Sequence, residues 1–412
     1  MIIRNASQLV CVASQSERAK TKLDACNLHV IENGAVILQD EEIQWVGHSS
    51  DLPPVPPDAE ILDAIGKLVL PGFIDSHTHL VFAGSRENEF EERLQGKTYQ
   101  EISAGGGGIN ATVEQVRGAS KGELKESARR RLQHLLSFGV TTVEVKSGYG
   151  LNLHDELKCL EVIGELNQEG PWELVPTFMG AHALPPEYQN NREGYVRLVL
   201  DKMLPEVARR HLAEFCDVFC EQGAFTLEES ERILIRAGDL GLQGKIHADE
   251  LSPVGGAELA ARLGAISADH LLCITEAGIE ALSRSQTVAT LLPGTAFFLG
   301  LAYAPARRLI EAGVPVALGS DCNPGTCPTE NLPLIGGIAC TQMKMLPAEV
   351  ISALTLNAAA AVGRSNRLGS IEVGKQADLI VCDVPDYRQL FYHFGVSHVG
   401  RVIKRGRVVY AA

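Results

Sequence analysis

Between residues 67 and 366 the chain repeats one alternation, a short apolar run rich in β-branched residues followed by an amphipathic stretch. The amphipathic stretches carry apolar residues at three- and four-residue spacing, which predicts helices over residues 121–137, 153–167, 194–211 and 227–237. Such alternation is typical of a parallel sheet wrapped by helices. Eight apolar runs can be counted, at residues 68–79, 139–146, 173–182, 216–221, 244–250, 265–270, 287–292 and 314–321. Because eight parallel strands close a barrel, the pattern predicts an α/β fold, a (β/α)8 TIM-like barrel.

The two ends of the chain have a different sequence pattern, with short runs of alternating apolar and polar residues between turn residues. Residues 34–38 and 42–47 are typical of antiparallel strands, and residues 369–383 and 400–410 repeat the pattern. The proline-rich stretch 52–57 is interpreted as a stiff connector, and residues 348–361 as helical. We therefore predict one small β-sandwich domain built from both ends, residues 1–66 and 367–412, with the barrel, residues 67–366, inserted between them.

The first barrel run ends in two histidines. Residues 68–74 are predicted to form one buried strand, and because strand side chains alternate, Asp75, His77 and His79 should point to the same side. Two neighbouring imidazoles suit a metal such as zinc. Two histidines hydrogen-bonded in a turn would give the same pattern, so the other strand ends must decide.

Titratable side chains also end three later runs. The fifth, sixth and eighth runs finish with His247, His270 and Asp321. A single histidine on an apolar run is more often structural than a ligand, but the carboxyl ends of barrel strands converge in space. Together these positions predict a metal site with three histidines and an aspartate as ligands, an open position for water, and His270 free to carry protons.

Composition limits the class of protein. With 412 residues, 45% of them hydrophobic, the chain can bury a large core, which excludes disorder. A formal net charge of -14 argues against nucleic acid or an anionic membrane surface as the main partner, although one buried arginine could still bind a small anion. No apolar run approaches the roughly 20 residues of a spanning helix, and the N-terminal run is too short for a signal peptide. Ten cysteines without a CxxC pair indicate free thiols, so we expect a cytoplasmic protein, and a homodimer as the commonest assembly.

Several motifs carry a resemblance that extends over nearly the whole chain. The order of residues 71–79, His247, His270 and 319–321, with the tail signature 374–379, resembles the amidohydrolase superfamily. More narrowly, the chain resembles the imidazolonepropionase family at Tyr99 and at residues 82–90, 105–109, 146–150, 180–182, 247–250 and 321–326. That family is a group of cyclic amide hydrolases that open the ring of 4-imidazolone-5-propanoate to N-formimidoyl-L-glutamate in histidine degradation. The resemblance therefore implies a small anionic substrate.

The resemblance also implies roles for individual residues. One divalent or trivalent metal ion per chain, zinc or iron, would be bound by His77, His79, His247 and Asp321. A metal-bound hydroxide would attack the ring carbonyl, and His270 and Asp321 would handle the protons, with the first acceptor left open. Two further catalytic positions are Glu250, which would hydrogen-bond the ring, and His182, which would contact the carbonyl oxygen.

The propionate tail of such a substrate needs a cationic partner. A buried carboxylate favours a bidentate arginine, and Arg86 is the candidate. A surface ion pair with Glu87 or Glu89 is the alternative. The remaining substrate contacts implied by the resemblance are Tyr99, Tyr149, His182, Glu250, Asn323, Gly325 and Thr326.

Other interpretations concern a second metal and a mobile loop. Some amidohydrolases bridge two metals with a carboxylated lysine on the fourth strand, but Lys146 lies on the second run. The fourth run ends in Glu221, which could bridge a second metal, yet one metal needs only the ligands already named, so we favour a single ion. The glycines at 105–108 lack the Lys-Ser/Thr of a phosphate loop and fit a segment that closes over substrate, or a simple flexible loop.

Two competing functions share the same sequence features. A related amidohydrolase that deaminates a purine, pyrimidine or triazine ring would share the metal ligands but would not need an arginine aimed at a carboxylate. A non-catalytic relative that keeps the barrel as a binding module would be expected to have lost ligands, whereas all four are present here.

Overall fold

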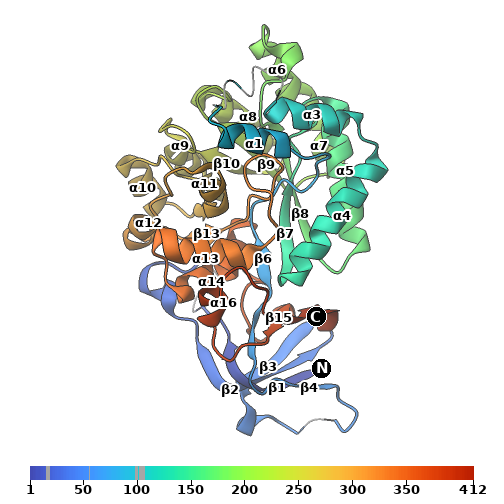
Figure 1. The fold of residues 1–412 in the computed structure, drawn as a ribbon, viewed down its shortest axis with the longest axis vertical. Helices are drawn as coiled ribbons and strands as arrows, with labels where there is room; N and C mark the ends of the chain where they lie inside the picture. The colour runs from blue at the N-terminus through green and yellow to red at the C-terminus, as the bar shows by residue number, and fades with distance from the viewer. Residues whose placement is uncertain (15–18, 55, 98–100, 102–106) are drawn as a thin grey trace.

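A parallel sheet of eight strands forms the larger part of the molecule in a computed structural model that describes residues 1–14, 19–54, 56–97, 101 and 107–412 (Figure 1). Each of the eight predicted runs supplies one strand of this sheet, and sequence neighbours pair in parallel throughout. The strands are β6 (Phe73–Asp75), β7 (Val140–Lys146), β8 (Glu173–Ala181), β9 (Phe215–Cys220), β10 (Gln243–Ala248), β11 (Ser267–His270), β12 (Val288–Leu291) and β13 (Val316–Leu318). The predicted (β/α)8 barrel is confirmed.

The barrel closes between its first and last strands, just beyond their ends. The N–H of Asp321 donates to the carbonyl of His77 at 3.0 Å, and the N–H of His79 donates to the carbonyl of Cys322 at 3.0 Å. Thr78 and Cys322 form a parallel bridge between these two segments. This seam places His77 and His79 directly beside Asp321.

Helices surround the barrel, and those predicted from periodicity are present. Residues 121–137 form one helix with the predicted limits, because Ser120 and Glu123 form a capping box at its start. Residues 194–211 are divided by a π turn at Val199–Met203. The helices are α1 (Glu87–Leu94), α3 (Ile109–Gly118), α4 (Lys121–Ser137), α5 (Leu153–Glu169), α6 (Arg192–Leu198), α7 (Leu204–Arg209), α8 (Leu227–Asp239), α9 (Gly256–Leu263), α10 (Glu276–Ser283), α11 (Pro293–Leu299), α12 (Ala306–Ala312), α13 (Leu332–Met343), α14 (Pro347–Leu354), α15 (Leu356–Ala361) and α16 (Gln389–Tyr392). Within the described ranges, none of these helices has the length and apolar character needed to span a bilayer.

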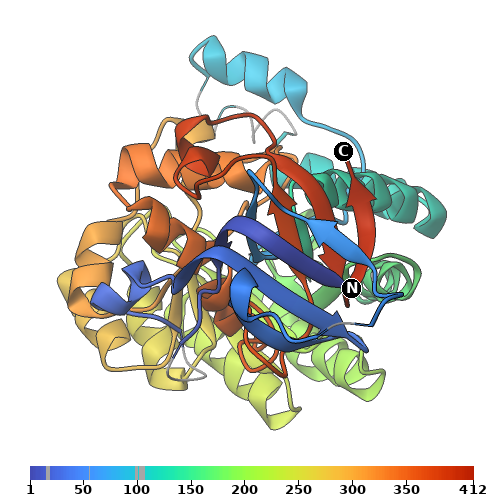
Figure 2. The ribbon, with the colours of Figure 1, turned by 90° about the horizontal axis from the view of Figure 1, so that it is seen from below.

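The two chain ends pair in a second, mixed sheet below the barrel (Figures 1 and 2). In Figure 2 the blue N-terminal strands and the red C-terminal strands lie side by side. β5 joins them, since it runs parallel to β1 and antiparallel to β14. The strands are β1 (Ile2–Val10), β2 (Val30–Gln39), β3 (Glu42–His48), β4 (Ile61–Asp63), β5 (Leu68–Pro71), β14 (Leu379–Cys382), β15 (Val399–Lys404) and β16 (Arg407–Ala411). The prediction that both ends build one small β unit is confirmed, with its strands hydrogen-bonded as one continuous sheet; the exact domain limits stay a prediction.

The opening apolar run requires one correction. The sequence predicts a single strand over residues 68–74, but Leu68–Pro71 lies in the end sheet and Phe73–Asp75 in the barrel. The chain passes between the sheets at Gly72, whose N–H donates to the carbonyl of Asp378 at 2.9 Å. A Cβ at this position would lie 2.5 Å from the side chain of Thr141. Because both segments are buried, hydropathy alone does not reveal the break.

Candidate metal and substrate site

Five titratable side chains from four strand ends meet in the centre of the barrel mouth. His77 and His79 follow β6, His247 lies in β10, His270 ends β11 and Asp321 follows β13, and all are buried. The Nε2 atoms of His79 and His247 are 3.4 Å apart. Asp321 Oδ1 lies 3.6 Å from Nε2 of His77 and 3.7 Å from Nε2 of His79. The structure therefore brings together all four predicted metal ligands with His270.

The donor atoms of this centre fit a single cation. Ligand atoms of His77, His79 and His247 lie within 4.8 Å of one another, and so do those of His77, His270 and Asp321. Bonds of 2.0–2.1 Å to zinc would place adjacent tetrahedral ligand atoms about 3.3–3.4 Å apart, close to the separations observed. Nε2 of His77 is buried and has no hydrogen-bond partner among the described residues, so it is available as a ligand.

Carboxylates hold two of the imidazoles from behind. Nδ1 of His77 lies 2.6 Å from Oδ2 of Asp269, and Nδ1 of His247 lies 3.0 Å from Oδ2 of Asp217. Asp269 can accept the Nδ1 proton of His77, and the charge of Asp217 beside His247 favours a proton on Nδ1 of that ring as well. Both contacts leave the Nε2 lone pair directed toward the centre, as metal-binding histidines require. Sequence reasoning missed Asp217 and Asp269; the only available signal was a carboxylate inside each of two predicted strand runs, residues 216–221 and 265–270.

A buried ammonium links these carboxylates. Nζ of Lys146 lies 2.8 Å from Asp217, 2.7 Å from Glu144 and 3.9 Å from Asp269. Burial lowers the pKa of Lys146, but the surrounding Asp217, Glu144 and Asp269 outweigh it, so the net shift is upward and the side chain stays charged. Nζ of Lys245 approaches Asp269 at 3.8 Å from the other side. Lys146 is therefore an ion-pair partner within the barrel interior.

Three histidines of the centre, His77, His79 and His270, have pKa values that favour the neutral form. Burial, followed by the positive charge of Lys146, holds the pKa of His77 well below its usual range. Burial, followed by His182 and His247, does the same for His79, and burial, followed by His247, for His270. Neutral imidazoles offer the lone pairs that a metal needs.

Burial shifts the pKa values of two acids of the centre upward. Burial raises the pKa of Asp321 to about 6, against a hydrogen bond of 2.5 Å from the Thr295 hydroxyl. Burial, then Asp321 and Glu221, raises the pKa of Glu250 to about 8. Oε1 of Glu250 lies 3.6 Å from Nδ1 of His270. Glu250 can therefore carry a proton at neutral pH.

Two further predicted contacts lie beside the histidines. The His182 ring stacks on His79 with centroids 5.0 Å apart, and the buried Tyr149 ring lies 5.7 Å from His79 and 5.3 Å from His182. Nδ1 of His182 donates to the carbonyl of Gly148 at 3.0 Å, and burial, followed by His247, lowers its pKa to about 3. In this neutral tautomer Nε2 is an acceptor, so it suits a ring N–H of a ligand better than a carbonyl oxygen.

Arg86 lies at the side of the centre formed by the turn after β13. Its Nη2 and Nε donate to Oε2 of Glu89 at 2.7 and 3.0 Å, so the ion pair considered as an alternative is present. The pair is not a typical surface pair, because the two side chains are only 10% and 14% exposed. A Cβ at Gly325 would lie 2.1 Å from Nη1 of Arg86, so the guanidinium packs against the backbone of the predicted substrate-binding turn.

Asn323 holds that turn in shape. Its Oδ1 accepts from the N–H groups of Gly325 and Thr326, both at 2.8 Å, and its Nδ2 donates to the carbonyl of Asp321 at 2.7 Å. The turn thus fixes the position of Gly325 beside Arg86. Tyr99 lies outside the described residues, as do Gly105 and Gly106 of the predicted closing segment.

The carboxylate of Glu221 is engaged elsewhere. It accepts from the N–H groups of Gln222, Leu251 and Ser252 and from the Ser252 hydroxyl. Neither group of candidate ligands found among the described residues includes Glu221. Its contacts hold the segment that follows Glu250.

Comparisons with known proteins identify the family. The amidohydrolase family model matches residues 92–410. An imidazolonepropionase from Geobacillus sp. (strain WCH70) is 52% identical over 99% of this chain and 97% of that protein. One from Fusobacterium nucleatum subsp. nucleatum is 51% identical over 100% of this chain and 98% of that protein. The chain belongs to the imidazolonepropionase family.

Solved structures support the fold of this imidazolonepropionase family member. A triazine hydrolase variant matches with a TM-score of 0.78 at 17% identity, covering 100% of this chain and 94% of that one. A 5-methylcytosine deaminase from Klebsiella pneumoniae matches with a TM-score of 0.76 at 18% identity, covering 100% and 98%. At this level of identity the similarity shows the shared barrel and end sheet.

Asp269→Asn should weaken metal binding by this imidazolonepropionase family member roughly 10- to 100-fold, because the Nδ1 proton of His77 loses its charged acceptor. The metal retained after dialysis against graded chelator concentrations, measured by elemental analysis, checks this. Asp239→Asn, at an exposed position in α8, is the matched control and should retain metal like the wild type. Equal retention by both variants would contradict the role of Asp269.

Proposed function

We propose that this chain is a metal-dependent cyclic amide hydrolase that opens the ring of 4-imidazolone-5-propanoate to N-formimidoyl-L-glutamate in histidine degradation. The observation that carries the proposal is 52% identity to an imidazolonepropionase over 99% of the chain. The cluster of buried histidines beside Asp321 supports a hydrolytic role.

One metal ion, zinc or iron, would be held by His77, His79, His247 and Asp321. When bound, such an ion lowers the pKa of a coordinated water to about 7 and polarises a carbonyl. Asp217 and Asp269 would keep two of these imidazoles in the tautomer with Nε2 free.

Asp321 and His270 would move the protons of the hydrolysis. Water adds to the ring carbonyl carbon, the C–N bond of the ring breaks, and one water proton travels to the departing nitrogen. Oδ2 of Asp321 accepts a hydrogen bond from the Thr295 hydroxyl, so Oδ1, which faces the histidines, is the atom placed to accept a proton. His270 is neutral and can accept a proton and then release it.

Substrate orientation would come from groups around the centre. Protonated Glu250 would donate to the ring, and the Nε2 lone pair of His182 would accept from a ring N–H. Arg86 would bind the propionate, since its Nη1 faces the Gly325 turn while Nε and Nη2 contact Glu89. The deaminase alternative is supported only by similarity of fold, at 18% identity to 5-methylcytosine deaminase.

We also propose a homodimer and a cytoplasmic location. All ten cysteines are free, which suits a reducing compartment.

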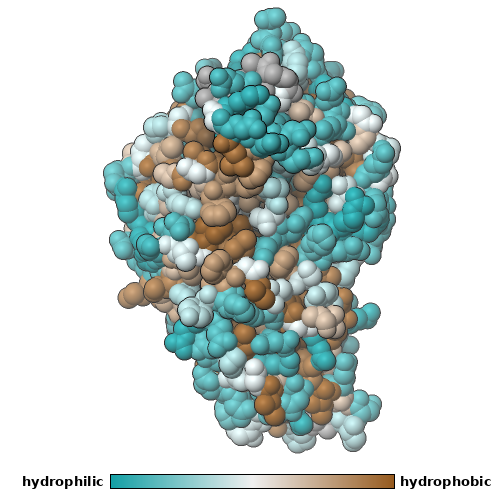
Figure 3. All heavy atoms as spheres, viewed as in Figure 1, coloured by the Kyte–Doolittle hydropathy of each residue, from teal (hydrophilic) through white to brown (hydrophobic). Residues whose placement is uncertain are grey.

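Figure 3 shows apolar surface around α11 and α13, and exposed large apolar side chains in and next to these helices include Phe297, Leu301 and Leu346. Contiguous exposed apolar surface often marks a protein interface, and twofold dimers are the commonest assemblies. Light scattering after gel filtration should give twice the mass of the chain, and a monomer at all concentrations would contradict the dimer.

Purified protein should consume 4-imidazolone-5-propanoate, form N-formimidoyl-L-glutamate and contain about one metal ion per chain. Product formation and metal content are measured on the same sample. Failure to act on this substrate together with deamination of guanine or cytosine would replace the proposed function with the competing one.

Arg86→Ala should raise the KM for the anionic substrate at least about tenfold, because the propionate loses its charged partner, and should leave the metal content unchanged. Steady-state kinetics and elemental analysis check this. Arg129→Ala, which removes a guanidinium from the outer surface of α4, is the control and should not alter KM. A wild-type KM for Arg86→Ala would remove Arg86 from the substrate site.

A further inference from the structure

The loop of residues 147–151, between β7 and α5, carries part of the proposed substrate site; we call it the Tyr149 loop. The Tyr149 ring is buried beside His79 and His182. The carbonyl of Gly148 accepts the Nδ1 proton of His182, which sets the tautomer of that ring. The shape of this loop therefore determines where two predicted substrate contacts lie.

The Tyr149 loop has a backbone conformation that needs external support. Gly148 and Leu151 have φ of +106° and +51°. The left-handed region is unfavourable for leucine and persists only where surrounding contacts enforce it. A Cβ at Gly148 would lie 2.9 Å from Nδ1 of His182, so the close approach of the loop to that ring also requires glycine.

Glu156, in the first turn of α5, supplies that support from inside. Its Oε1 accepts the N–H groups of Gly150 and Leu151 at 2.8 Å, and its two oxygens accept that of Gly148 at 3.2 and 3.1 Å. The side chain is fully buried, and no ion pair with Glu156 occurs in the described part of the chain. A buried carboxylate is costly unless it is hydrogen-bonded, so here the loop N–H groups take the place of a counter-cation.

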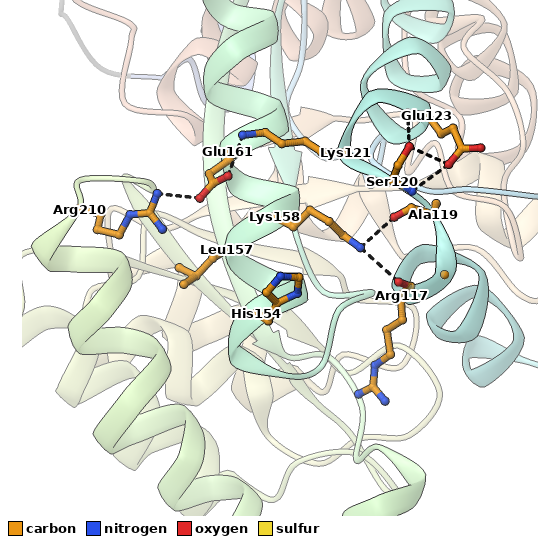
Figure 4. A pocket seen from close by; sticks show the side chains of 11 residues that line it. Arg117, Ala119, Ser120, Lys121, Glu123, His154, Leu157, Lys158, Glu161 and Arg210 are labelled. Atoms are coloured by element: carbon orange, nitrogen blue, oxygen red, sulfur yellow. Dashed lines mark hydrogen bonds and ion pairs between the residues drawn. The ribbon is translucent and has the colours of Figure 1, made fainter.

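Arg117 supports the same loop from outside. Its Nε donates to the carbonyl of Gly150 at 2.7 Å and its Nη2 to that of Leu151 at 3.2 Å. Figure 4 shows Arg117 at the edge of a cleft of about 590 Å³ between α3, α4 and α5. The other cations lining this cleft are Lys121, Lys158 and Arg210, and all three bind acids or carbonyls of the chain. Of these four cations, Arg117 contacts the loop, and the other three are engaged elsewhere in the chain.

Glu156 does more than favour the start of a helix. Acidic residues are common in first turns because they complement the helix dipole. At α5, however, the Asn152 side chain caps the helix by accepting from the N–H of Asp155, and Asp155 pairs with Lys158. The Glu156 carboxylate instead reaches past the helix start and binds three N–H groups of the preceding loop.

We propose that Glu156 is a positioning residue for the hydrolase. It holds the Tyr149 loop so that the Tyr149 ring faces the substrate and His182 keeps the tautomer in which Nε2 can accept from it. The proposal rests on the proposed function. It assigns Glu156 no contact with substrate or metal.

Glu156→Gln tests this, because the amide keeps the size of the side chain, loses its charge and sets an NH2 group against the N–H of Gly148. We expect kcat/KM to fall roughly 10- to 100-fold with unchanged metal content, since small displacements of contact groups have effects of this size. In a double-mutant cycle with Tyr149→Phe, the two losses should be less than multiplicative, because one acts through the other. Fully multiplicative losses, or an unchanged kcat/KM, would overturn the proposal.

Glu349→Gln is the matched control. Glu349 is also buried and accepts a backbone N–H, that of Leu346 at 2.7 Å, but it lies at the start of α14 and pairs with Arg307. This variant should lower the thermal unfolding midpoint without changing kcat/KM. A similar loss of kcat/KM in Glu349→Gln would show that the effect of Glu156 is one of general stability. Where Glu156→Gln does not fold, Glu156→Asp, which keeps the charge but not the reach, is used in the same cycle.

Hydrogen exchange tests the role of Glu156 independently of the proposed function. Wild-type turnover of imidazolonepropanoate tests the function, whereas exchange at the amides of residues 147–151 needs no substrate. Exchange should be slow in the wild type and faster in Glu156→Gln. Equal exchange in the two proteins would overturn the holding role even if the wild type proved inactive on this substrate.

Discussion

Two carboxylates inside the barrel, Asp217 and Asp269, bind the Nδ1 sides of His247 and His77, and the centre depends on these two contacts. An imidazole can offer Nε2 as a ligand only if Nδ1 holds the proton, and a buried acceptor fixes that tautomer. Buried carboxylates are unfavourable unless they are paired. Lys146 lies within 2.8 Å of Asp217 and 3.9 Å of Asp269, and so balances their charge.

The seam between the first and last barrel strands also shapes the site. The first and last strands are joined beyond their ends, where the N–H of Asp321 binds the carbonyl of His77. A Cβ at Gly319 would lie 3.0 Å from Cβ of His77, so a side chain at this position would crowd the segment that carries His77. The contact that closes the fold therefore also sets the spacing between the His77 imidazole and the Asp321 carboxylate.

Local patterns predicted the parts of the structure that are determined locally. The eight strands, the helix at 121–137 and the convergence of His247 and Asp321 on His77 follow from periodicity and from the position of strand ends. The break at Gly72 was not predictable, because apolar residues flank it and the pairing partners are distant in sequence. Likewise, the predicted helix at 348–361 is interrupted at Thr355, where the backbone has φ of -125° and ψ of -94°.

The carboxylates behind the site were unpredictable for a related reason: nothing near Asp217 or Asp269 in the sequence marks the imidazole that each one contacts. The contacts that hold the loops around the centre are equally unmarked in the sequence, since acids there bind backbone N–H groups.

Glu221 binds the N–H groups of Leu251 and Ser252, next to Glu250. Peptide dipoles satisfy such a carboxylate without cancelling its charge, which therefore still acts on its neighbours. Burial, Asp321 and Glu221 together raise the pKa of Glu250 to about 8. A lysine holding this segment in place of N–H groups would lower the pKa of Glu250, because its positive charge favours the ionised form over the protonated form that donates a hydrogen bond.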